Sequence, residues 1–160
     1  MITSVGFWLI RLTIWLAVVA WLLRVFVEAS GRPFAARDRL IRWTWLVGAV
    51  ACLTHVVVAM GFAHCWSLAN AMRHTAQITR QVVGIELPSS VFVNFGFAAL
   101  WLADAAREFR SRPLHRMGFA RHTVWAVMML NATVVFGPRY WTWIAVPCVL
   151  ALAGIWHRRA

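Results

Sequence analysis

Long apolar runs separated by short, arginine-rich segments are the feature of this sequence that most restricts how it can fold. Hydrophobic residues make up 62% of the 160 residues, whereas soluble globular domains contain about 45–50%. Apolar windows of about 20 residues have the length that a helix needs to cross the hydrocarbon core of a bilayer. We therefore expect an all-α integral membrane protein that folds as a single polytopic domain over residues 1–160.

Five stretches are predicted to span the membrane as a helical bundle. The stretch 43–63 is flanked by tryptophans, which are typical of the two membrane interfaces. The last apolar stretch, 122–156, would form one helix about 52 Å long, far longer than a hydrocarbon core of about 30 Å. Because Gly137-Pro138 is a strong helix breaker, we divide this stretch in two. The predicted spans are residues 5–27, 43–63, 91–106, 119–136 and 141–156.

The distribution of arginine predicts how these spans are oriented. With five spans, twelve arginines lie on one side of the membrane: Arg24, Arg32, Arg37, Arg39, Arg42, Arg107, Arg110, Arg112, Arg116, Arg121, Arg158 and Arg159. The other side holds Arg73, Arg80 and Arg139, and Arg11 falls within the first span. Since basic residues accumulate in cytoplasmic loops, we expect the N-terminus outside and the C-terminus in the cytoplasm, in a cell (inner) membrane. A four-span alternative leaves Arg139 at mid-depth and is disfavoured.

A different pattern joins the second and third spans. Between residues 67 and 83, apolar side chains recur at helical spacing, opposite polar residues such as Asn70 and Arg73. Gly84 then provides a common signal for the end of a helix. The spacing therefore predicts an amphipathic helix that lies on the outer surface of the membrane.

The net charge of +11 raises the question of nucleic acid as a partner. The arginines stand at the ends of apolar runs, where they meet anionic lipid head groups, rather than along one solvated face as in nucleic-acid binders. We therefore expect the lipid bilayer and its anionic head groups at the arginine-rich inner face as partners, and no nucleic acid. A larger membrane complex or a homo-oligomer is also compatible. The first apolar stretch lacks a positive leader and is expected to be a retained span rather than a removed signal peptide.

A few polar residues lie where a bilayer makes them costly. His55, Asn94 and Asn131 all fall in the outer halves of their predicted spans, and His64 and His74 stand above them at the outer interface. Polar residues at this depth usually face the interior of a bundle, where they serve function or bind neighbouring helices. We expect His55 to form a hydrogen bond with Asn94 or Asn131 and so to fix the packing.

A haem or transition-metal site is the alternative interpretation of these residues. His55 and His64 lie about 180° apart on an ideal helix, so both cannot face one central haem. His64, Cys65 and His74 together offer nitrogen and sulfur donors near the outer surface, a mixture that suits zinc or copper. Absence of any cofactor remains the leading expectation, because no known ligand spacing is present.

Asp104 is an acid close to the inner end of an otherwise apolar span. We expect it to pair with Arg107, with Arg121 or with an arginine of the first loop. Arg24, in contrast, is expected to extend its side chain toward the lipid head groups. The other acids are expected at or beyond the span ends, so a proton relay through paired intramembrane acids is disfavoured.

The sequence favours a multi-pass membrane protein without catalytic activity, either a subunit or a structural protein of the membrane. Its short loops leave little room for a soluble active site, and motifs for nucleophilic catalysis or phosphate binding are missing from the sequence. The alternative is a redox protein that binds haem or metal at the outer face. A transporter fragment acting as an oligomer is weaker, because inverted repeats and paired intramembrane charges are not seen in the sequence.

Overall fold

The computed structural model describes residues 4–31, 36–110, 119–135 and 140–157, without the side chains of 119–122, 134, 135, 142, 149 and 152–157. Every regular element in these ranges is helical, and the predicted all-α class is confirmed for them. The elements are α1 (Ser4–Ser30), α2 (Arg37–Phe62), α3 (Leu68–Val83), the 3₁₀ turn η1 (Pro88–Ser90), α4 (Val91–Arg110), α5 (Phe119–Leu130), the π-helical turn η2 (Asn131–Val135) and α6 (Tyr140–His157).

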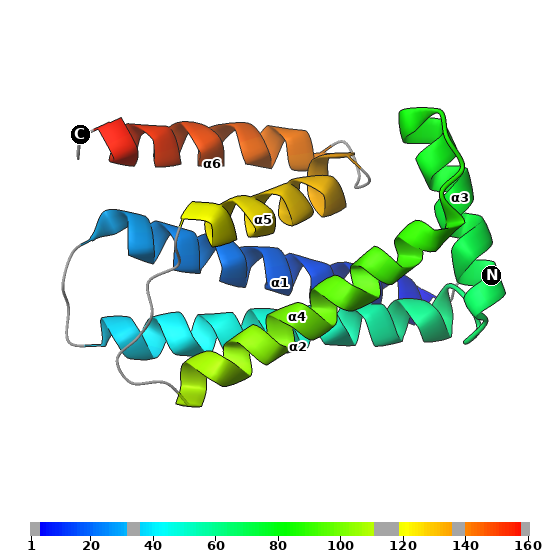
Figure 1. Ribbon diagram of the computed structural model, residues 1–160, viewed down its shortest axis with the longest axis horizontal. Coiled ribbons are helices and arrows are strands. Elements are labelled where there is room, and N and C mark those ends of the chain that lie inside the picture. Colours follow the sequence, from blue (N-terminus) through cyan, green and yellow to red (C-terminus); the bar gives the residue numbers. More distant parts are fainter. Residues whose placement is uncertain (1–3, 32–35, 111–118, 136–139, 158–160) are drawn as a thin grey trace.

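Helices α1, α2, α5 and α6 run roughly along the long axis of the molecule, α4 crosses α2 obliquely, and α3 stands across one end (Figure 1). The N-terminal end of α1 lies against the C-terminal end of α2, where Gly6 faces the side chain of Phe62, and the C-terminal end of α6 lies at the opposite end of the molecule (Figure 1). Helix α1 packs along α2, α4 packs on α2, and α6 contacts α1. The bundle therefore has two distinct ends, one that carries α3 and another where α1 ends and α2 begins (Figure 1).

Within the described residues, three helices are long and apolar enough to cross a membrane: Ser4–Ser30, Arg37–Phe62 and Pro88–Arg110. A shorter apolar helix covers Thr123–Thr133. These lengths are compatible with a membrane location, and the count of five spans stays a prediction. Several helices also extend past the predicted spans, since α1 continues to Ser30, α2 begins at Arg37 and α4 continues to Arg110. Hydropathy detects only the apolar part of a helix, whereas the backbone hydrogen bonds continue through its charged ends.

Helix α3 occupies the stretch for which the sequence predicts an amphipathic helix. Its N-cap is Ser67, whose side chain accepts a hydrogen bond of 3.3 Å from the backbone N–H of Asn70. Its end is Gly84, which adopts the left-handed conformation with φ 79°. A serine N-cap and a left-handed glycine satisfy backbone groups that the helix itself leaves unpaired. The limits of α3 are therefore set by local chemistry.

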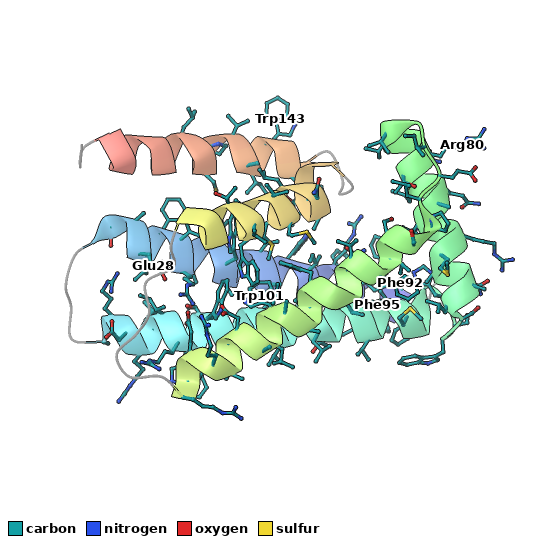
Figure 2. All side chains as sticks on the ribbon, in the orientation of Figure 1. Glu28, Arg80, Phe92, Phe95, Trp101 and Trp143 are labelled. Carbon is teal, nitrogen blue, oxygen red and sulfur yellow. The ribbon has the colours of Figure 1, made fainter. Side chains whose placement is uncertain are left out.

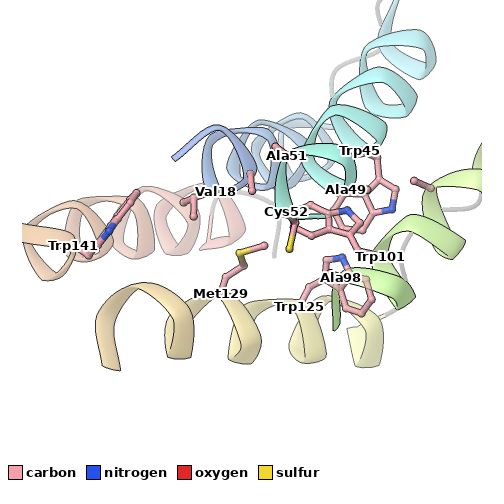
Figure 3. Packing of buried hydrophobic residues seen from close by; sticks show 12 residues of the cluster. Val18, Trp45, Ala49, Ala51, Cys52, Ala98, Trp101, Trp125, Met129 and Trp141 are labelled. Carbon is pink, nitrogen blue, oxygen red and sulfur yellow. The ribbon is translucent and has the colours of Figure 1, made fainter. Parts of the chain in front are cut away.

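The core is built from small residues that let tryptophans enter between helices (Figure 3). Trp45 of α2 and Trp101 of α4 are fully buried, and their ring centroids lie 5.0 Å apart. Trp125 of α5 stacks on Trp45 at 5.8 Å. Gly48 makes room for this cluster, because a Cβ atom at that position would lie 2.6 Å from Cζ2 of Trp101. These contacts bring α2, α4 and α5 around one aromatic centre.

The outer surface of the bundle is rich in large apolar side chains. Trp143 projects from α6 and is 83% exposed, and Phe92 of α4 is exposed as well (Figure 2). Inside the bundle, by contrast, Arg24 is 0% exposed and Glu108 is 2% exposed. Soluble proteins rarely bury charged side chains or expose so much contiguous apolar surface. The many exposed apolar side chains and the buried charged pair are thus compatible with a membrane location.

Candidate functional site

The most concentrated polar chemistry in the described part of the chain surrounds Arg24. The guanidinium of Arg24 donates to both carboxylate oxygens of Glu108, at 2.6 and 2.7 Å, and its Nε donates to Glu28 at 2.8 Å. A guanidinium that meets a carboxylate through two parallel hydrogen bonds forms one of the strongest polar contacts in proteins. This contact joins α1 to α4 through fully buried side chains.

Helix α2 completes the arrangement with two further contacts. The guanidinium carbon of Arg24 lies 4.3 Å from the centroid of the Trp45 ring, in cation–π geometry. Trp45 in turn donates its indole N–H to Asp104 at 3.0 Å. Arg42 donates to the backbone carbonyl of Glu108. We call Arg24, Glu28, Arg42, Trp45, Asp104 and Glu108 the ionic network.

The structure corrects the interpretation of Arg24 as a side chain that extends toward head groups. It is turned inward because two carboxylates, Glu28 and Glu108, converge on it. A buried charge is tolerated only when it is paired and hydrogen-bonded in this way. A sequence signal was present, since Arg24 and Glu28 are spaced i, i+4 and therefore lie on the same face of one helix.

Asp104 lies at the edge of the ionic network. Its carboxylate is 3.6 Å from Nη2 of Arg107 and accepts the hydrogen bond from Trp45. The side chain of Arg121, which the sequence offers as a second partner, lies outside the described residues. Glu108, four residues after Asp104, is the acid that sequence reasoning passed over. The i, i+4 spacing of these two acids places both on the face of α4 that meets α2.

The structure separates the polar residues of the predicted outer cluster. His55 lies against α1, where its Nδ1 is 2.9 Å from the carbonyl oxygen of Ile10 and 3.4 Å from Oγ1 of Thr13. These contacts replace the expected hydrogen bond to Asn94 or Asn131. Asn94 is exposed on α4, and Asn131 begins the π-helical turn η2. His55 therefore contributes to the α1–α2 interface through its contacts with Ile10 and Thr13.

His64 and His74 do come together, at the turn between α2 and α3. The centroids of their rings are 5.4 Å apart, with an angle of 50° between the ring planes. Partial burial, followed by the electrostatic effect of His74, lowers the pKa of His64 from its usual value. Cys65 is exposed beside them. Among the described residues, however, no three His, Cys, Asp or Glu side chains are grouped so that they could hold a metal ion. We call His64 and His74 the histidine pair.

A small cavity of about 60 Å³ lies between α1, the α5–η2 helix and α6. Its lining includes Val18, Thr133, Trp141 and Cys148. Pockets that hold cofactors or drug-sized ligands usually measure about 300–1,000 Å³. This cavity is therefore too small for a cofactor or a drug-sized ligand, and it lies next to the π-helical turn.

The polar side chains discussed above thus form two groups, the ionic network inside the bundle and the histidine pair at the end of the bundle that carries α3. Models of protein families, curated proteins and solved structures were all compared with the chain, and none matches it. What the two regions can do follows from their geometry. The ionic network is internally satisfied, whereas the histidine pair stands at the surface with ring nitrogens that can accept a ligand.

Proposed function

We propose that this chain is a multi-pass protein of a cell (inner) membrane, with five spans, that serves as a non-catalytic membrane subunit or structural protein. One observation carries the proposal: charged side chains are buried and paired inside the bundle while large apolar side chains cover its outside. A bilayer favours this arrangement, because it solvates apolar surface and makes an unpaired charge costly.

The state of the ionic network supports a structural role. Both carboxylate oxygens of Glu108 accept hydrogen bonds from Arg24, and Arg24 is fully buried. Neither group is therefore free to contact a substrate. A buried ion pair is weak evidence of net stability, but in some proteins it fixes one arrangement of the packed elements. We therefore assign the network the task of fixing the relative positions of α1, α2 and α4.

The exposed apolar side chains of the bundle are consistent with a role as one subunit of a membrane assembly. Leu12, Val19 and Leu23 are exposed along one side of α1, and Trp143 and Leu150 are exposed on α6. Such surfaces are covered by lipid or by the apolar helices of another subunit. The arginines at the predicted inner face add contacts with anionic head groups.

The orientation is tested with reporter fusions. A periplasmic reporter fused after Arg80 is expected to be active, and the same reporter fused after Arg112 is expected to be silent, because the predicted inner loops hold most of the arginines. The protein should also stay in the membrane pellet after alkaline carbonate extraction. Extraction into the soluble fraction, or activity of the Arg112 fusion, would contradict the proposal.

A further inference from the structure

The turn between α2 and α3 brings two imidazole rings close together, with their planes tilted by 50°, at the end of the molecule where the predicted spans have ended. We propose that His64 and His74 bind a divalent transition-metal ion, such as copper or zinc, through one ring nitrogen each. The remaining coordination positions are filled by water. This site is independent of the ionic network and of the proposed structural role.

The separation of the two rings agrees with joint coordination. A metal–nitrogen bond of about 2.0 Å places each ring centroid about 3.2 Å from the ion. Two such rings at a tetrahedral angle then have centroids about 5.2 Å apart. The centroids of His64 and His74 are 5.4 Å apart. Small rotations of the half-buried His64 ring and the exposed His74 ring are therefore enough to direct both at one ion.

The backbone that carries His64 is firmly held. Its carbonyl oxygen accepts hydrogen bonds from the backbone N–H of Ser67 at 2.9 Å and from the side chain of Asn70 at 3.3 Å. Trp66 donates its backbone N–H to Met60 at 2.8 Å. Cys65 and Trp66 both adopt positive φ, at 51° and 58°. Residues other than glycine are strained in this conformation, and such strain is concentrated at binding and switch sites. The turn is thus a pre-organised support for one of the two ligands.

The donor set decides which ions fit. Two neutral imidazoles suit copper, zinc and nickel, and copper(II) binds most tightly in the usual order of stability. Cys65 is exposed but does not form a three-donor group with the histidines. The neighbouring cation Arg73 is engaged by Asn70 through a 2.5 Å hydrogen bond. We therefore infer an open site with two protein ligands, which would tie the end of α2 to the second turn of α3.

The test is a titration of the purified full-length protein in detergent with CuCl₂ and, separately, with ZnCl₂. Wild-type protein is expected to bind one Cu²⁺ per chain, with an electron paramagnetic resonance spectrum that shows coupling to imidazole nitrogen. His64→Ala and His74→Ala should each weaken binding at least tenfold. Cys65→Ser, which removes the adjacent thiol, and His115→Ala, which removes a histidine of the predicted inner loop, should bind as the wild type does.

Three results would overturn the proposal. The first is no stoichiometric binding to the wild type, and the second is unchanged binding in both His64→Ala and His74→Ala. The third is an equal loss in Cys65→Ser, which would replace the two-imidazole site by one that includes the thiol. Circular dichroism and gel filtration without metal should be the same for all variants, so that lost binding cannot be attributed to unfolding. Failure of this test leaves the membrane topology, measured by reporter fusions, unaffected.

Discussion

At the scale of single residues, the contact between Arg24 and Glu108 joins the most deeply buried charges that the structure describes. Glu108→Ala removes both carboxylate oxygens and leaves the guanidinium buried beside Glu28 alone. We expect the free energy of unfolding to fall by about 3–5 kcal/mol, which is typical when one partner of a buried ion pair is lost. The measurement is unfolding in detergent followed by circular dichroism.

Arg80 and Glu86 provide the matched control for this prediction. They form an ion pair of 2.8 Å, but their side chains are 70% and 58% exposed. Glu86→Ala should therefore change the stability by no more than about 1 kcal/mol. Equal effects of Glu86→Ala and Glu108→Ala would show that burial does not govern the strength of these pairs.

A second residue-scale prediction separates pairing from packing. In the Glu108→Ala background, Arg24→Met removes the charge that has lost its main partner. We expect this second substitution to cost less than it does in the wild type, with a coupling free energy of about 1–3 kcal/mol in a double-mutant cycle. Additive effects would contradict a direct interaction between the two side chains.

At the scale of helices, the approach of α2 to α4 depends on Gly48. A Cβ atom there would lie 2.6 Å from the indole ring of Trp101, which is itself fully buried. Gly48→Ala is therefore expected to lower the stability by about 1–3 kcal/mol through overpacking. Thermal unfolding of the detergent-solubilised protein measures the effect.

Gly96 on α4 is the control, because a Cβ atom at that position meets nothing within 4 Å. Gly96→Ala should be neutral or should stabilise the protein by up to about 1 kcal/mol, since alanine favours the helix more than glycine does. If Gly96→Ala destabilises the protein as much as Gly48→Ala, the close contact with Trp101 is not the cause.

Helix limits differ in how far the sequence could predict them. The ends of α3 follow from Ser67 and Gly84, whose effects on the backbone are local. The π-helical turn η2 within the predicted span 119–136 has no comparable local signal.

The partner of Arg24 is a contact that the sequence does not predict. Hydropathy indicates how deep a residue lies along its own helix, and it carries no information about Glu108, 84 positions further along the chain. Contacts between distant segments are what the sequence alone could not supply.

At the scale of the whole molecule, the exposed thiol of Cys65 reports on orientation. A membrane-impermeant maleimide added outside intact cells is expected to label the protein through Cys65, because Cys52 is buried, Cys148 lies within the predicted span 141–156, and the turn lies at the predicted outer face. Cys65→Ser should abolish this labelling. Adding Ser111→Cys to the Cys65→Ser variant should restore labelling only after the cells are permeabilised. Labelling of Ser111→Cys in intact cells would reverse the proposed orientation.

The i, i+4 spacing of Arg24 and Glu28 has a consequence for biosynthesis. A chain made from its N-terminus presents α1 to the bilayer well before Glu108 is translated. Glu28 contacts Arg24 within the same helix at 2.8 Å, so α1 carries its own counter-ion. The first helix can therefore enter lipid with the charge of Arg24 already paired, and the later arrival of α4 adds the contact between Arg24 and Glu108.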